Sequence, residues 1–129
     1  MNLHSLINVV LLIYLVSFPV IIEVNKRVLK GKNKSFNQAL KMGRKIHPIA
    51  GLVLIVSGAL HGYWKMGGQF VFHTGSLLLL ALLLNGILGF LYRKKRIKRL
   101  AMMHRIAGFI IVGLFLLHYI NPRVCQVRW

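Results

Sequence analysis

Four long apolar runs, separated by polar connectors, make up most of this chain. The runs cover residues 3–24, 46–64, 71–92 and 100–120. An α-helix rises about 1.5 Å per residue, so about 20 residues cross the roughly 30 Å hydrocarbon core of a bilayer. The pattern predicts one all-α domain over residues 1–129, an integral membrane four-helix bundle with up-down-up-down topology.

A secretory signal peptide is the alternative for the first run. Such a peptide has a basic stretch before its apolar core and a cleavage site of the A-x-A type. Residues 1–24 have neither feature, and the run is longer than a typical signal-peptide core. We therefore expect this run to be a membrane span.

Three connectors separate the runs, at residues 25–45, 65–70 and 93–99. Asparagine, glycine and serine in the first connector are typical of turns, so we predict a solvated basic loop that faces anionic headgroups. The alternative is a short amphipathic helix over residues 36–42 whose apolar face, with Phe36, Leu40 and Gly43, points toward lipid.

Basic residues are concentrated in two of these connectors. The chain has 18 Lys and Arg and a single acid, Glu23. Eight of the bases lie in residues 25–45 and six in residues 93–99. The connectors and termini of the opposite side carry only Lys65, Arg123 and Arg128. The positive-inside rule places the basic connectors in the cytoplasm and both termini outside it, in what we expect to be a bacterial cytoplasmic membrane.

Composition excludes several classes of protein. The chain is 57% hydrophobic with a mean hydropathy of +0.66, which is too apolar for an ordinary soluble domain of this size. Nucleic-acid binding is not expected, because the bases lie between apolar runs and not on a soluble face. Cys125 is the only cysteine, so no internal disulfide forms, and no C-x-x-C-H motif for covalent haem attachment is present.

A repeated sequence marks the second and fourth runs. Residues His47 to His61 read HPIAGLVLIVSGALH, and residues His104 to His118 read HRIAGFIIVGLFLLH. Both copies begin H-x-I-A-G and end in a second histidine, and they are offset by 57 residues. That offset is roughly one helix pair, so we predict two helical-hairpin repeats.

The spacing of the histidines predicts a specific chemistry. Fourteen residues advance about 21 Å along a helix and return to nearly the same face, most closely in a left-handed bundle. The second and fourth helices run parallel, so His47 is level with His104 near the inner surface, and His61 with His118 near the outer one. Two facing imidazoles at one level are the axial ligands of a six-coordinate haem. We therefore predict two bis-histidine haem b groups.

The four histidines also have alternative roles. Histidines inside a membrane form hydrogen bonds between helices. A zinc site needs three or four ligands at one point, which ligands about 21 Å apart do not supply. A proton or metal transporter that uses the histidines as a relay is a further hypothesis, and a carboxylate within the spans would have supported it.

Glycines and cations near the predicted haem levels extend the candidate site. Gly75 and Gly89 are also fourteen residues apart and fall level with the outer and inner histidine pairs, where a porphyrin edge needs small residues. Ordinary small-residue helix packing is the alternative. Candidates for binding the haem propionates through charge-assisted hydrogen bonds are Arg44, Lys45 and Arg105 at the inner level and Lys65 and Arg123 at the outer level. Alternatively, these cations only set the orientation of the chain in the membrane and bind no propionate.

Two further histidines, His4 and His73, are predicted to lie near the outer surface. They are candidates for a quinol or proton-transfer site beside the outer haem. The alternative is that they are interfacial histidines in contact with water.

The paired H-x13-H on the second and fourth runs resembles the di-haem four-helix bundle of cytochrome b in the quinol-oxidising bc complexes. The HR-x-x-G opening at His104 is similar to the membrane domain of ferric reductases and NADPH oxidases. The resemblance covers all four runs and implies that each hairpin supplies one axial ligand to each haem, as the pairs His47/His104 and His61/His118. The flavin and nicotinamide domains of those families have no counterpart in these runs, so the electron donor and acceptor stay open.

The predicted function is transmembrane electron transfer, as a carrier or as the membrane subunit of an oxidoreductase. Predicted partners are the lipid bilayer and an acidic cytoplasmic donor, such as a flavodoxin- or ferredoxin-like domain, that the basic face would steer. Lipid attraction and topology are the alternative role of that face. The alternative function is a quinol-oxidising, ferric-reducing or oxygen-reducing enzyme that acts at the outer face, with a quinone as a further partner. No catalytic residue is assigned, since both axial positions of each iron are filled.

Overall fold

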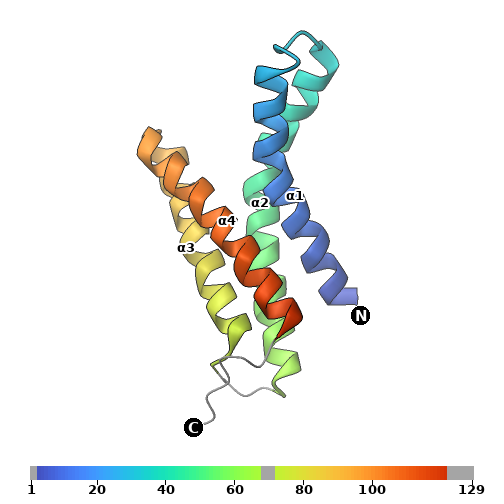
Figure 1. Cartoon of the computed structure of the whole chain (residues 1–129), viewed down its shortest axis with the longest axis vertical. Helices are drawn as coiled ribbons and strands as arrows, with labels where there is room; N and C mark the ends of the chain where they lie inside the picture. The colour runs from blue at the N-terminus through green and yellow to red at the C-terminus, as the bar shows by residue number, and fades with distance from the viewer. Residues whose placement is uncertain (1–2, 68–71, 122–129) are drawn as a thin grey trace. The chain divides into compact units, whose positions relative to one another are not determined.

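The computed structural model describes residues 3–67 and 72–121, which are almost entirely helical (Figure 1). The helices, in chain order, are α1 (Leu3–Arg27), α2 (Lys34–Lys65), α3 (Thr74–Lys95) and α4 (Lys98–Ile120). No β-strand occurs in this part of the chain. The predicted all-α fold class is confirmed.

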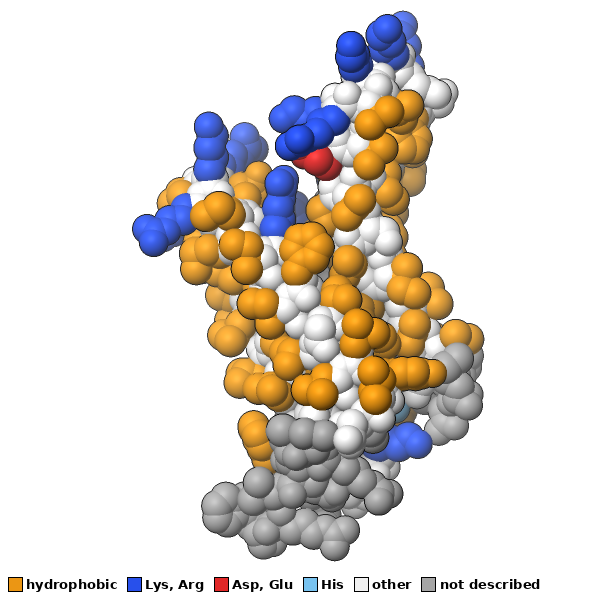
Figure 2. All heavy atoms as spheres, viewed as in Figure 1, with side chains coloured by type: hydrophobic (Ala, Val, Ile, Leu, Met, Phe, Trp, Pro, Cys, Tyr) orange, Lys and Arg blue, Asp and Glu red, His pale blue; other side chains and the backbone are white. Residues whose placement is uncertain are grey.

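All four helices have the length and composition of membrane spans. The mean hydropathy of their most apolar windows ranges from 1.4 in α2 to 2.5 in α1. Large apolar side chains point outward along them, as Figure 2 shows, and Phe90 on α3 is 67% exposed. An apolar outer surface of this extent needs a non-aqueous surrounding, so the helices suit a multi-pass membrane protein in contact with lipid.

The chain folds as two compact units. Unit 1 covers residues 1–54 and holds α1 with the first part of α2. Unit 2 covers residues 55–129 and holds the rest of α2 together with α3 and α4. The up-down-up-down order of all four helices and the sidedness of the termini stay predictions.

In unit 1, α1 and α2 form a helical hairpin with a close contact at Gly43. The ring of Phe18, which is buried on α1, covers Gly43 so tightly that a Cβ atom there would overlap it. The hydroxyl of Tyr14 donates a hydrogen bond to the Gly43 carbonyl oxygen at 3.2 Å. The two helices approach here because α2 has no side chain at this position.

The first connector is much shorter than predicted. Only residues 28–33 are non-helical, because α2 begins at Lys34, so the predicted loop over residues 25–45 is wrong. The alternative helix over residues 36–42 exists, but Leu40 is buried and Gly43 faces Phe18. The predicted lipid-facing direction is therefore wrong as well, since α1 continues to Arg27 and offers a packing surface along this stretch.

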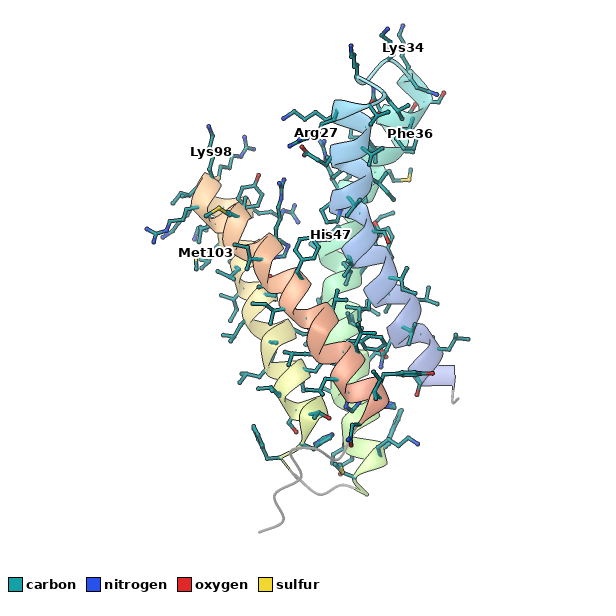
Figure 3. All side chains as sticks on the ribbon, in the orientation of Figure 1. Arg27, Lys34, Phe36, His47, Lys98 and Met103 are labelled. Atoms are coloured by element: carbon teal, nitrogen blue, oxygen red, sulfur yellow. The ribbon has the colours of Figure 1, made fainter. Side chains whose placement is uncertain are left out.

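Three asparagines close the turn of this hairpin. Asn33 caps α2, because its side-chain oxygen accepts a hydrogen bond from the Phe36 N–H at 3.1 Å. The Asn37 amide donates to the Gly31 carbonyl oxygen at 2.6 Å and accepts from Asn25, which is buried, at 2.9 Å. Figure 3 shows Lys34 and Phe36 at this end of the hairpin.

In unit 2, α3 and α4 pack against each other and are joined by a short basic turn. Arg96 ends α3 in a left-handed conformation with φ 53°, and its N–H donates to the Tyr92 carbonyl oxygen at 2.8 Å. The last part of α2 packs on α3, since a Cβ atom at Gly86 would lie 3.2 Å from Ile55. Lys98 marks the basic end of this unit in Figure 3.

Candidate haem-binding histidines

The inner histidine of α4, His104, lies against a glycine of α3. A Cβ atom at Gly89 would be 3.0 Å from Cε1 of the His104 ring. The ring passes over Gly89 and reaches the carbonyl oxygen of Asn85, one turn earlier on α3, at 3.0 Å from Nδ1. We call this arrangement of Asn85, Gly89 and His104 the Gly89 site.

The outer histidine of α4, His118, has the same relation to α3. A Cβ atom at Gly75 would be 3.1 Å from Cε1 of His118, and it would meet the ring of His73 still more closely, 2.6 Å from Nε2. The Nδ1 atom of His118 is 2.9 Å from the hydroxyl oxygen of Thr74, whose residue is only 2% exposed. We call this arrangement of Thr74, Gly75 and His118 the Gly75 site. Two glycines fourteen residues apart on α3 thus contact two histidines fourteen residues apart on α4.

The hydrogen bond at the Gly89 site determines the tautomer of His104. A carbonyl oxygen only accepts, so Nδ1 of His104 carries the hydrogen and donates it. The lone pair of the neutral ring then lies on Nε2, which is the form that coordinates a metal while Nδ1–H is held by an outer acceptor. At the Gly75 site the Thr74 hydroxyl is able to accept in the same way.

One more histidine lies beside His118 in unit 2. The rings of His73 and His118 have their centroids 6.1 Å apart, and Nδ1 of His73 is 2.9 Å from the hydroxyl of Ser76. His61 lies on the last part of α2, in the same unit. The structure therefore places His73 next to His118, and the pairing of His118 with His61 stays a prediction.

The remaining histidine of the repeats, His47, lies in unit 1 near two aromatic rings. Its ring centroid is 5.4 Å from that of Phe18 and 6.5 Å from that of Tyr14. Figure 3 labels His47 on α2. Its predicted partner, His104, belongs to unit 2. The pairing of these two histidines stays a prediction.

The predicted propionate-binding cations lie on the surface. Arg44, Lys45, Lys65 and Arg105 are all exposed. Arg123 and the side chain of His4 lie outside the described residues, so neither is placed. In the described part of the chain, no group of three or more His, Cys, Asp or Glu residues is arranged to hold a metal ion. A tetrahedral zinc site, which needs three or four protein ligands, is therefore not found in that part. Haem iron with two imidazole ligands needs only two histidines.

Sequence reasoning missed the two acceptors on α3. Thr74 directly precedes Gly75, and Asn85 lies four residues before Gly89. The Thr74 hydroxyl next to Gly75 was an available signal, whereas the acceptor at the Gly89 site is a backbone carbonyl, which any residue at position 85 would offer.

No protein-family model, curated protein or solved structure matches this chain.

Proposed function

We propose that this protein transfers electrons across a membrane through two bis-histidine haem b groups, as a carrier or as the membrane subunit of an oxidoreductase. The observation that carries the proposal is the pair of matching sites on α3. At each one a glycine makes room for an α4 histidine, and an acceptor lies at hydrogen-bond distance from its Nδ1.

The residues present fit haem as the bound group. His118 with His61, and His104 with His47, would supply the axial nitrogens, and Gly75 and Gly89 would leave space beside them. Bound haem iron supplies reversible one-electron oxidation and reduction. The Asn85 carbonyl oxygen accepts from Nδ1–H of His104 and so favours the coordinating tautomer, and the Thr74 hydroxyl would do the same for His118. The apolar spans would exclude water around both imidazoles.

The surroundings of the protein follow from the same proposal. We place the basic connectors on the cytoplasmic side of a bacterial membrane and both termini outside. The exposed cations Arg44, Lys45, Lys65 and Arg105 are proposed to bind the propionates. The basic ends of the two units would attract an acidic electron donor protein.

A second function is favoured by the position of His73. Its ring lies 6.1 Å from that of His118 and is held by Ser76. A quinol that binds beside His73 would be oxidised at the outer face, which would make the protein an enzyme in its own right. Quinol-dependent haem reduction by the purified protein alone distinguishes this function from a passive relay.

Single histidine replacements test the proposal. His118→Ala or His61→Ala should remove one haem, and His104→Ala or His47→Ala the other, each leaving about half of the wild-type haem content by pyridine haemochrome assay. His73→Ala is the matched control and should keep both haems. Full haem content in all four ligand variants would refute the ligand assignment.

A further inference from the structure

We propose that Thr74 is a positioning residue: its hydroxyl orients His118 and lowers the reduction potential of the haem that His118 would bind. This inference rests on the proposed function and adds to it a residue that tunes one haem and not the other. Three observations support it: the burial of Thr74, its contact with His118 and the different chemistry of the two sites on α3.

Thr74 is the most deeply buried polar residue in the described part of the chain. It stands at the first position of α3, and 2% of its surface is exposed. Its hydroxyl oxygen lies 2.9 Å from Nδ1 of His118. Gly75 follows directly and leaves room for the ring edge. The hydroxyl and the glycine together define where this imidazole lies.

The two sites on α3 offer acceptors of different kinds. At the Gly89 site the acceptor is the backbone carbonyl of Asn85, which no side-chain substitution removes. At the Gly75 site it is a side-chain hydroxyl, which substitution does remove. The chain therefore has one histidine whose hydrogen-bond acceptor can be altered without changing the other.

The direction of the effect follows from coordination chemistry. Iron bound at Nε2 requires the hydrogen on Nδ1, so the Thr74 oxygen must accept that hydrogen bond. An acceptor at Nδ1–H increases the electron density of the imidazole and makes it a stronger donor to iron. A stronger donor favours the oxidised iron, which has the higher positive charge, and so lowers the reduction potential.

The test is a redox titration of the purified holoprotein followed by its haem absorption, together with the low-spin electron paramagnetic resonance spectrum. Thr74→Val keeps the size of the side chain and removes the acceptor. We expect the midpoint of one haem to move upward and its resonance to shift, while the other haem is unchanged. Thr74→Ser restores the acceptor and should return the midpoint most of the way to the wild-type value.

Ser76→Ala is the matched control, because it removes a hydroxyl that lies 2.9 Å from Nδ1 of His73 on the same turn of α3. Two unmoved midpoints in Thr74→Val, or an equal shift in Ser76→Ala, would overturn the role of Thr74. If Thr74→Val loses one haem, retention of that haem in Thr74→Ser supports the role, and its loss there too overturns it. A wild-type protein without haem would instead refute the proposed function, so the two failures are distinguishable.

Discussion

At the scale of single residues, a missing side chain and a nearby acceptor fix each histidine of α4. Gly89 lets the His104 ring approach α3 closely enough for Nδ1–H to reach a backbone carbonyl at 3.0 Å. Gly75 does the same for His118 next to the Thr74 hydroxyl. Both imidazoles are thereby ordered by the protein itself, which reduces the reorganisation needed when a ligand binds.

Gly89→Ala should disturb only one of these histidines. The new Cβ atom would stand 3.0 Å from the His104 ring, so the ring must move by a few tenths of an ångström away from Asn85. We expect a lower occupancy of the haem bound by His104, measured by haemochrome assay. Gly113→Ala is the control, because no atom lies within 4 Å of the new Cβ position. Equal haem content in both variants would mean that Gly89 has no part in the site.

His73 provides a second test at this scale. It lies beside His118 but is not assigned as a ligand, so His73→Ala should keep the low-spin spectra of both haems. The quinol-oxidase hypothesis predicts in addition that His73→Ala slows haem reduction by a quinol. Loss of a haem in this variant would show that the outer ligand pair is assigned wrongly.

At the scale of elements, the two helices of the unit 1 hairpin approach most closely at Gly43. Phe18 is buried against Gly43, and the Tyr14 hydroxyl bonds to the Gly43 carbonyl oxygen. His47 lies one turn further along α2 and contacts the same two rings. The packing that joins α1 to α2 therefore also positions this histidine.

Gly43→Ala should weaken that packing. The added methyl group overlaps the Phe18 ring, and overpacking of this kind costs about 1–3 kcal/mol. We expect a lower thermal unfolding midpoint, followed by circular dichroism in detergent. Gly51→Ala, on the same helix with open space around its Cβ position, should leave the midpoint unchanged or raise it slightly. A Gly43→Ala midpoint equal to that of Gly51→Ala would contradict the close contact.

The sequence predicted the helices well where hydropathy defines them. The apolar runs at 71–92 and 100–120 correspond to α3 (Thr74–Lys95) and α4 (Lys98–Ile120). The start of α2 was missed because its first turns are polar and basic, whereas the Asn33 cap and the packing of Leu40 and Gly43 belong to the folded hairpin. The two acceptors on α3 were missed for a related reason, because their contacts with α4 are tertiary. A single threonine in an apolar run is not specific, and a backbone carbonyl leaves no mark in the sequence. By contrast, the sequence did predict that Gly75 lies at the same depth as His118 and Gly89 at the same depth as His104. That prediction used the fourteen-residue spacing and the antiparallel direction of the third run.

At the scale of the whole molecule, charge distribution determines the predicted orientation. Fourteen of the 18 basic residues lie in residues 25–45 and 93–99, counted as eight plus six. In the described structure these residues form the turn ends of the two units, as Figure 2 shows. The positive-inside rule therefore predicts that both turns face the cytoplasm.

Cysteine labelling tests this orientation. In a chain with Cys125 replaced by Ser, a single cysteine at Lys32 or Arg96 should be protected from a membrane-impermeant maleimide in intact cells. A single cysteine at Met66 should be labelled under the same conditions. Labelling of position 32 together with protection of position 66 would mean that the predicted sidedness is inverted.

The most direct test of the central claim is the haem content and spectrum of the purified wild-type protein. We predict two moles of haem b per mole of chain, with the sharp reduced-minus-oxidised bands of six-coordinate low-spin haem. A colourless protein, or one whose haem is high-spin or bound at less than one per chain after reconstitution, would contradict the account.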